Sequence, residues 1–222
     1  MANQEIPMMV RDNRKPGWLF YLGWVIASAL GIPIAWAITW AIMPLVTNAV
    51  GETVQVGGQS HITEDFLGLY VLLPVLGLLA GLLQYPLLRR YLARMASWIA
   101  ATVLGWLLLS VVLGVLTLFA VAVPPALVIV LIGGSIGLPQ WLLLRQRVRR
   151  AAVWMLASVL GWGMALLLAP GAISNQQQVL AVMLVPPLAG SIAWWLLLVK
   201  LPQRESHWGN TPRSKSMPLG AH

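Results

Sequence analysis

Six long apolar segments, none of which contains an Asp, Glu, Lys, Arg or His, constrain this chain more than any other feature. About 20 apolar residues in a helix cross a bilayer core of about 30 Å, where each backbone polar group must be bonded within the protein. The segments lie at about residues 18–43, 66–88, 98–120, 124–144, 152–169 and 179–199. The sequence therefore predicts an all-α, polytopic membrane protein with six transmembrane helices.

The charged residues predict how these helices are oriented. All 14 Lys and Arg residues precede the first segment, follow the sixth, or lie between the second and third or the fourth and fifth. The charged residues of the opposite side are Glu52, Glu64 and Asp65. By the positive-inside rule, both termini are expected in the cytoplasm. Orientation accounts for the net charge of +8, so no nucleic-acid partner is expected.

The chain repeats part of its own sequence. The segment from Gln84 to Trp106 matches the segment from Gln140 to Trp162 at 12 of 23 positions without a gap, and we call the offset from Gln84 to Gln140 the repeat period. The Leu-Gly-Trp that ends both segments also stands at residues 22–24, so we align Trp24 with the two later tryptophans. Such self-similarity predicts a fold built from equivalent units.

The repeat divides the chain into three tandem hairpins. Each hairpin enters and leaves on the same side of the membrane, so the three are expected to be parallel rather than inverted repeats. The predicted membrane domain covers 17–200, with polar tails on either side and an external loop that lengthens the first hairpin. The boundaries are hairpins 17–88, 97–145 and 152–200, external loop 45–65, N-terminal tail 1–16 and C-terminal tail 201–222.

Small residues recur at the same period in the second, fourth and sixth segments. Their small-xxx-small spacing lets helix backbones approach closely in lipid. We expect packing faces within the chain, while a dimerisation seam, or a groove that admits a flat ligand to the backbone, is the alternative. These residues are Gly77, Gly81, Gly133, Gly137, Ala189 and Ala193.

The chain contains 12 tryptophans, and we divide them by depth. Those near the basic ends of the segments are expected in an aromatic belt at the membrane interface. This group comprises Trp18, Trp98, Trp141, Trp154, Trp194 and Trp195. Trp24, Trp106 and Trp162 stand beside glycines and are expected deeper in the membrane, where their indole N–H groups need partners.

Two interpretations of these three deep tryptophans remain open. The rings either fill space between hairpins or line a slot for a long apolar molecule such as a carotenoid, a quinone tail or a lipid acyl chain. Trp36 and Trp40, one turn apart, would extend such a slot across the membrane. The repeat-equivalent Gln84 and Gln140 would either bond between helices or receive the polar head of the ligand.

Catalytic and metal-binding residues are scarce. The chain has no Cys, and its three histidines stand outside the six segments without spaced partners. Glu64 and Asp65 near His61 fit the start of a helix, where acidic side chains complement the helix dipole. The spans contain no Asp, Glu, Lys, Arg or His, which argues against a proton-coupled carrier. Neither enzymatic activity nor a metal site is expected.

The blocks Gly81 to Arg89 and Gly137 to Arg145, each followed by a Trp and a Leu-Gly-Trp, resemble a group of uncharacterised bacterial membrane proteins. This group occurs in green non-sulfur bacteria and cyanobacteria. The chain departs from the pattern at Tyr85 and Pro86, and its sixth segment lacks the Gln. By analogy, the resemblance implies a bacterial inner-membrane location and a role near pigments or photosynthetic complexes.

These observations together predict a non-enzymatic accessory subunit of a photosynthetic or electron-transport membrane assembly. It is expected to bind lipids and an apolar cofactor, with carotenoid as the first choice, and to form a homodimer or join a larger complex. The alternative from a different class is a transporter of small neutral solutes or lipids. That alternative requires inward-facing polar residues clustered on the second and sixth segments, which Pro74 and Pro186 are expected to kink, whereas the sequence shows only isolated ones.

Overall fold

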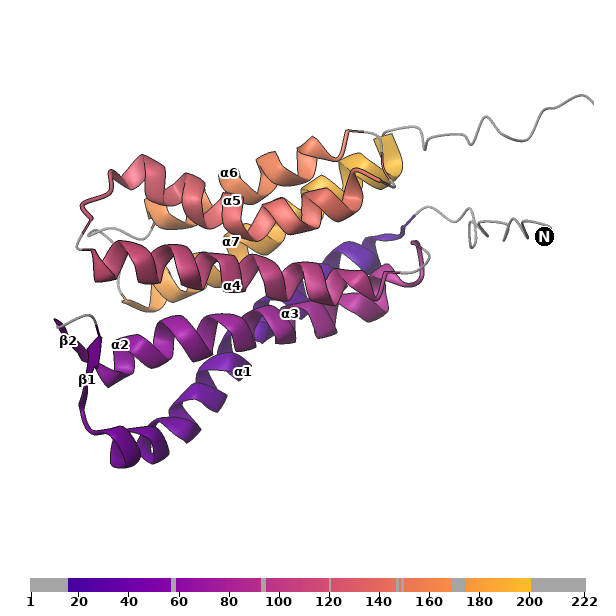
Figure 1. Cartoon of the computed structure of the whole chain (residues 1–222). Coiled ribbons are helices and arrows are strands. Elements are labelled where there is room, and N and C mark those ends of the chain that lie inside the picture. Colours follow the sequence, from indigo (N-terminus) through magenta and orange to yellow (C-terminus); the bar gives the residue numbers. More distant parts are fainter. Residues whose placement is uncertain are drawn as a thin grey trace, which may run out of the picture.

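The computed structural model describes residues 16–56, 59–92, 95–119, 121–146, 148, 150–168 and 175–200. Apart from Pro16, both predicted tails lie outside this part of the chain, as do His207 and His222. The described chain is all-α except for one short two-stranded sheet (Figure 1). The elements are α1 (Trp18–Val50), β1 (Thr53–Val56), β2 (Gln59–Ile62), α2 (Thr63–Leu67), η1 (Gly68–Leu72), α3 (Leu73–Leu88), α4 (Ser97–Leu118), α5 (Pro125–Leu144), α6 (Ala152–Leu168), α7 (Asn175–Trp195) and η2 (Leu196–Lys200).

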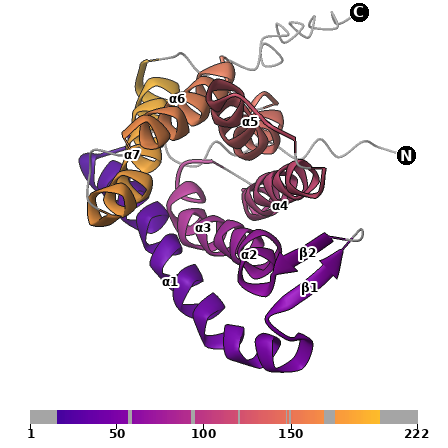
Figure 2. The ribbon, with the colours of Figure 1, turned by 90° about the vertical axis from the view of Figure 1, so that its left-hand side faces the viewer.

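The helices form a ring in the order in which they occur in the chain. Each of α3 to α7 packs against its neighbours in sequence, α1 packs against α3, and α7 closes the ring by packing against α1 (Figure 2). The half of α1 near β1 diverges from this ring (Figures 1 and 2). The ring therefore encloses a central axis most tightly at the opposite end.

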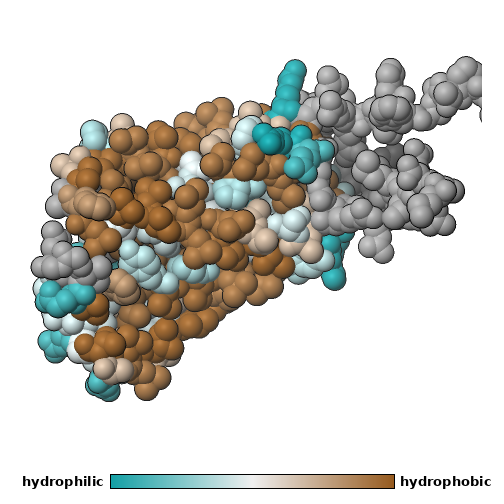
Figure 3. All heavy atoms as spheres, in the orientation of Figure 1, coloured by the Kyte–Doolittle hydropathy of each residue, from teal (hydrophilic) through white to brown (hydrophobic). Residues whose placement is uncertain are grey.

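The face of the bundle in Figure 3 is mostly apolar between its two ends. Leu22, Leu104 and Leu160 are examples of the many large apolar side chains that point outward. Within the described part of the chain, five helical stretches are long and apolar enough to cross a membrane, whereas α6 has 17 residues and is shorter than that criterion requires. Since water disfavours so much exposed apolar surface, the fold and surface define an α-helical membrane protein.

The charged side chains mark the two ends of the bundle. The basic end carries Arg89, Arg90 and Arg145, which follow α3 and α5. The acidic end carries Glu52 and the start of α2 with Glu64 and Asp65 in its first turn. We call these the basic end and the acidic end of the bundle.

The helix boundaries lie within about four residues of the six predicted segments except in α1, when α2, η1 and α3 are taken as one segment and α7 and η2 as another. This helix continues through Pro44 to Val50 and so covers the first part of the segment 45–65 that was expected to be a loop. The rest of that segment contains an antiparallel hairpin that was not predicted, with Thr53 paired to Ile62. In the sequence, Gly57 and Gly58 stand between its strands, and such a pair is a common hairpin signal.

The small residues of α3 and α5 pack against neighbouring helices of the same chain. A Cβ at Gly77 would lie 2.8 Å from the side chain of Trp106, and one at Gly133 would lie 2.5 Å from Cα of Val159. Gly81 and Gly137 likewise meet α4 and α6, and Ala189 meets Gly161. These contacts favour the packing interpretation, and nothing in them supports a dimerisation seam.

Candidate functional site

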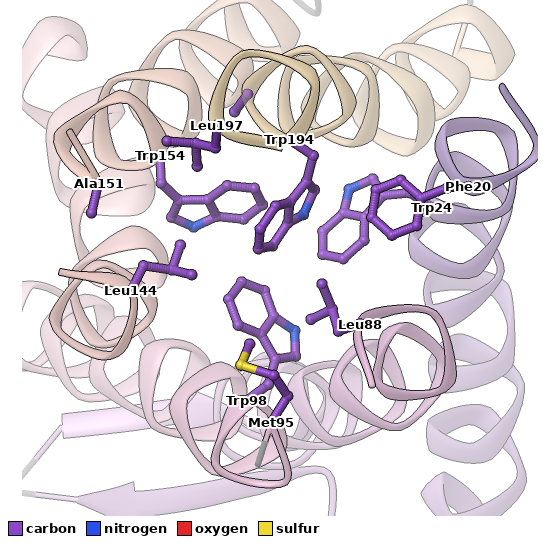
Figure 4. Close-up of a cluster of buried hydrophobic side chains, with 11 residues drawn as sticks. Phe20, Trp24, Leu88, Met95, Trp98, Leu144, Ala151, Trp154, Trp194 and Leu197 are labelled. Carbon is purple, nitrogen blue, oxygen red and sulfur yellow. The ribbon is translucent and has the colours of Figure 1, made fainter. Parts of the chain in front are cut away.

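Four tryptophans from four different helices meet on the axis of the bundle near its basic end. Trp24 of α1, Trp98 of α4, Trp154 of α6 and Trp194 of α7 are at most 6% exposed. All six distances between their ring centroids lie between 5.0 and 5.9 Å. We call these four residues the tryptophan cluster (Figure 4).

Side chains from the other two helices complete the closure at this level. Leu88 at the end of α3 and Leu144 at the end of α5 are fully buried in the same core (Figure 4). Phe20 packs edge-on against Trp194, with ring centroids 6.4 Å apart. Edge-to-face pairs at such distances stabilise a core by about 0.5–1.5 kcal/mol each beyond the burial of area. The six helices of the ring, α1 and α3 to α7, thus all close its basic end around one aromatic core.

This location corrects an expectation from the sequence. Trp98, Trp154 and Trp194 were expected in an aromatic belt at the membrane interface, but they point inward and are buried. Trp18 and Trp195, in contrast, are 70% and 41% exposed, as the belt interpretation requires. The position of a tryptophan along its helix therefore did not show whether its side chain points into the bundle or outward.

The alignment of Trp24 was also wrong. The Leu-Gly-Trp motif placed Trp24 beside Trp106 and Trp162, yet the structure places it in the tryptophan cluster with Trp98 and Trp154. Trp106 and Trp162 instead form a separate edge-to-face pair, with ring centroids 5.6 Å apart. We call these two residues the aromatic pair.

A chamber lies between the tryptophan cluster and the aromatic pair. All six long helices contribute to its wall. About 90 Å³ of its volume is open to the centre of a water molecule, whereas a single water needs about 10–15 Å³ by the same measure. The lining residues are Trp24, Ser28, Ile32, Leu76, Ala80, Gln84, Thr102, Trp106, Ile136, Gln140, Trp154, Ser158, Trp162, Val182, Pro186, Pro187 and Gly190.

The chamber has a defined height along the bundle. Its lining extends from Trp154 to Trp162 in α6 and from Val182 to Gly190 in α7, which is a rise of eight residue steps in each helix. At 1.5 Å per residue this corresponds to about 12 Å. The chamber therefore covers less than half of a hydrocarbon core of about 30 Å.

Five polar side chains encircle the middle of the chamber. They come from α1, α3, α4, α5 and α6, and we call them the polar belt. The sequence presents these residues singly, but the bundle brings them together around the chamber. They do not cluster on the second and sixth segments as a transporter was expected to require, because α3 contributes only Gln84 and α7 contributes none. The belt consists of Ser28, Gln84, Thr102, Gln140 and Ser158.

Two equivalent hydrogen bonds connect the polar belt to the tryptophan cluster. Trp98 Nε1 donates to Gln84 Oε1, and Trp154 Nε1 donates to Gln140 Oε1, each over 2.8 Å. The two donors are one repeat period apart, and so are the two acceptors. Each glutamine thus satisfies an indole N–H that has no other partner in this buried place.

The glutamine amino groups extend these bonds to a hydroxyl group. Gln84 Nε2 donates to Ser28 Oγ over 2.9 Å, and Gln140 Nε2 donates to Thr102 Oγ1 over 3.0 Å. Ser28 and Thr102 donate in turn to the carbonyl oxygens of Trp24 and Trp98, each over 2.8 Å. Because Trp98 takes part twice, one continuous relay of hydrogen bonds joins α1, α3, α4, α5 and α6.

Five of the seven residues predicted to bind a ligand line the chamber. Trp24, Trp106, Trp162, Gln84 and Gln140 meet there, although they come from five different helices. Trp36 and Trp40 do not. They stack on each other with centroids 6.1 Å apart, are about half exposed, and lie on the outer surface of α1.

Sequence reasoning missed the hydroxyl groups and three of the four clustered tryptophans. One signal points to the hydroxyl groups and to two of the missed tryptophans. A hydroxyl residue follows four positions after Trp24, Trp98 and Trp154, which places both side chains on one face of a helix. Trp194 lacks this spacing, and the spacing also occurs at Trp106 and Ser110. Gln84 stands 14 residues before Trp98, and Gln140 stands 14 residues before Trp154.

The described residues contain no group of three or more His, Asp or Glu side chains placed to hold a metal ion. No protein-family model, curated protein or solved structure matches the chain. The chamber, with its aromatic walls and its polar belt, is therefore the candidate functional site.

Proposed function

We propose that this chain is a non-enzymatic membrane protein that holds a flat, largely apolar ligand in the chamber between the tryptophan cluster and the aromatic pair. In this proposal six spans form three tandem parallel hairpins, with the basic end and both termini in the cytoplasm of a bacterial cell. The arginines of the basic end and the recurrence of the Gln–Trp bond after one repeat period support this arrangement.

The single observation that carries the ligand proposal is a chamber that combines aromatic walls with amide and hydroxyl groups, next to the tryptophan cluster near the basic end of the apolar helices. Such a combination is typical of sites that bind small organic molecules, where apolar walls give affinity and a few polar groups fix orientation. The Trp24, Trp106, Trp154 and Trp162 rings offer flat surfaces for a ring system.

A carotenoid remains our first candidate for the apolar ligand, with a restriction set by the chamber. The chamber is about 12 Å high, whereas the membrane core is roughly 30 Å thick. A rod-shaped carotenoid long enough to cross that core would therefore place only one end in the chamber. The rest of the rod would pass between helices into lipid. Other long apolar molecules with a ring at one end fit the same description.

We further propose that the protein packs as an accessory subunit of a photosynthetic or electron-transport assembly, or as a homodimer. Support comes from the diverging half of α1, where the stacked Trp36 and Trp40 present an exposed aromatic surface. Large exposed aromatic side chains are enriched at protein interfaces, and lipid would cover them otherwise.

The ligand proposal is tested by filling the chamber. Val182 lines it from α7, while Leu184, two residues away, is 41% exposed on the outer surface. We expect Val182→Phe to abolish copurification of an organic ligand with the protein extracted in mild detergent, and Leu184→Phe to retain it. Mass spectrometry and the visible absorption spectrum identify the ligand. Equal ligand content in both variants, or none in the unchanged protein offered carotenoids and quinones, would refute the proposal.

A transporter of small neutral solutes is the second candidate, and the polar belt is the observation that favours it. The belt gives such a solute hydrogen-bonding partners, and the tryptophan cluster closes the basic end beneath it. Vesicles containing the protein would then swell in isotonic glycerol faster than empty vesicles. Swelling that Val182→Phe suppresses, without any copurifying ligand, would favour the transporter.

A further inference from the structure

The two glutamines of the polar belt have only one possible orientation. An indole N–H donates and cannot accept, so the atom that meets Trp98 or Trp154 must be the amide oxygen. The distances of 2.8 Å from each indole nitrogen to Oε1 of Gln84 and Gln140 agree with this assignment. The amino group of each amide therefore points away from the tryptophan that it serves.

Each amino group has two N–H donors, and the hydroxyl next to it accepts from one. Ser28 and Thr102 accept because their own protons already bond the carbonyl oxygens of Trp24 and Trp98. Neither hydroxyl has a proton left for a ligand. In the described part of the chain, the second N–H of each amide has no acceptor.

These two spare donors belong to the chamber. Gln84 and Gln140 are 7% and 5% exposed, and both line the chamber wall. A buried N–H without an acceptor is costly, so the relay favours an occupant that brings acceptors. The chamber thus combines flat aromatic surfaces with donors, whereas the protons of Ser28 and Thr102 are already used.

We infer that the bound ligand carries a ring carbonyl that accepts from the spare N–H of Gln84, Gln140 or both. This inference rests on the proposed ligand-binding function and specifies the chemistry of its ligand. A conjugated ring carbonyl is flat, neutral and an acceptor only, which matches the aromatic walls and the two donors. A quinone head group and the keto end ring of a carotenoid share this chemistry, whereas a hydrocarbon carotenoid lacks it.

The substitution of Gln by Glu separates the spare donor from the rest of the relay. A carboxyl group without a charged partner in such an apolar place stays protonated. Its carbonyl oxygen then accepts from the indole and its hydroxyl proton reaches the neighbouring hydroxyl, so both structural bonds persist. Only the second N–H is lost. Gln146→Glu, at an exposed position of the basic end, is the matched control.

The experiment measures binding of three probes to the full chain in nanodiscs: a short-chain ubiquinone, the diketone carotenoid canthaxanthin, and β-carotene. Quenching of indole fluorescence reports the dissociation constants. We expect at least one carbonyl probe to bind more tightly than β-carotene and to lose about tenfold in affinity in Gln84→Glu or Gln140→Glu, the effect of one hydrogen bond. Gln146→Glu should bind like the unchanged protein.

The outcomes distinguish the inference from the proposed function. Binding of β-carotene as tight as that of both carbonyl probes, insensitive to Gln84→Glu and Gln140→Glu, would overturn the inference and keep a ligand-binding chamber. Binding of no probe would overturn both. A loss specific to ubiquinone identifies a quinone head group as the ligand chemistry, and a loss specific to canthaxanthin identifies a keto carotenoid.

A second measurement covers variants that fail to fold. The infrared carbonyl stretch of the bound probe, recorded with the unchanged protein, should lie at lower frequency than that of the same probe in hexane, because the carbonyl accepts a hydrogen bond. A stretch equal to that in hexane would overturn the inference without any variant.

Discussion

Five helices of the ring share one relay of side-chain hydrogen bonds, and α7 stands outside it. The relay passes from α1 through α3, α4 and α5 to α6 by way of Gln84 and Gln140. Between α7 and α1, a longer side-chain bond of 3.2 Å joins Ser191 Oγ to the carbonyl oxygen of Tyr21. Trp194 of α7 has an indole N–H without a partner among the described residues.

The sequence explains this difference. The residue one repeat period after Gln140 is Leu196, so the third hairpin lacks the amide that the first two possess. In its place α7 contributes Trp194, the fourth ring of the tryptophan cluster. The ring of helices is thus held by polar bonds over most of its circumference and closed by aromatic packing at α7.

The largest effect is expected where the relay is cut. Gln140→Leu removes an acceptor from Trp154 and a donor from Thr102, and it leaves the indole N–H unpaired in the core. We expect a loss of about 3 kcal/mol in the free energy of unfolding. Thermal unfolding in detergent measures it. Leu196→Ala, at the repeat-equivalent position of the third hairpin, should cost clearly less, and an equal cost would show that the relay adds nothing.

The second largest loss of stability is expected where the backbones of α5 and α6, two helices joined by the relay, lie close together. A Cβ at Gly133 would lie 2.5 Å from Cα of Val159, while one at Gly134 would meet nothing within 4 Å. Gly133→Ala should therefore destabilise the protein by about 2 kcal/mol, because α5 and α6 must separate. Gly134→Ala should leave stability unchanged or raise it slightly. Similar unfolding temperatures for the two variants would contradict this packing.

The same substitution at two positions of the tryptophan cluster compares a helix of the relay with α7. Trp154→Phe and Trp194→Phe each replace a buried indole by a smaller ring. Only the first also breaks a hydrogen bond, since Trp154 donates to Gln140 and Trp194 has no partner in the described chain. We expect Trp154→Phe to be about 1 kcal/mol more destabilising by the same unfolding measurement. The reverse order would contradict the proposed difference.

The smallest effect is expected at the closing contact of α7. Ser191→Ala removes the 3.2 Å bond to the carbonyl oxygen of Tyr21, which already belongs to a helix. Hydrogen bonds between membrane helices average about 0.6 kcal/mol, so a change of about that size is expected. A loss as large as that of Gln140→Leu would show that α7 is held by polar bonding after all.

Much of the fold followed from the sequence, because the length of an apolar segment sets the length of a helix in lipid. The observed ends of α4, α5 and α6, and of α2, η1 and α3 taken together, lie within a few residues of those predicted. The prediction was wrong for α1, which was expected to end near residue 43 and to lead into an external loop over 45–65, whereas the helix continues through Pro44 to Val50. Helices in membrane proteins tolerate proline more readily than helices in water.

The candidate site followed only in part. The repeat period singled out Gln84 and Gln140, and their partners Trp98 and Trp154 recur at the same period. Trp24 was misaligned because it stands further before Gln84 in the chain than Trp98 stands before Gln140. The extra length of the first hairpin shifts the register, and a local tripeptide match cannot correct for that.

The sequence by itself determined that the chain forms apolar helices, which residues recur in them, and that charge gathers at the ends. These properties are local, since they depend on how each segment meets lipid or water. The tertiary structure decided which faces of the helices point inward. Trp98, Trp154 and Trp194 form part of a buried core rather than an aromatic belt at the membrane interface. The five separate polar residues form the polar belt of the chamber. Both follow because the ring of helices turns these side chains toward one axis.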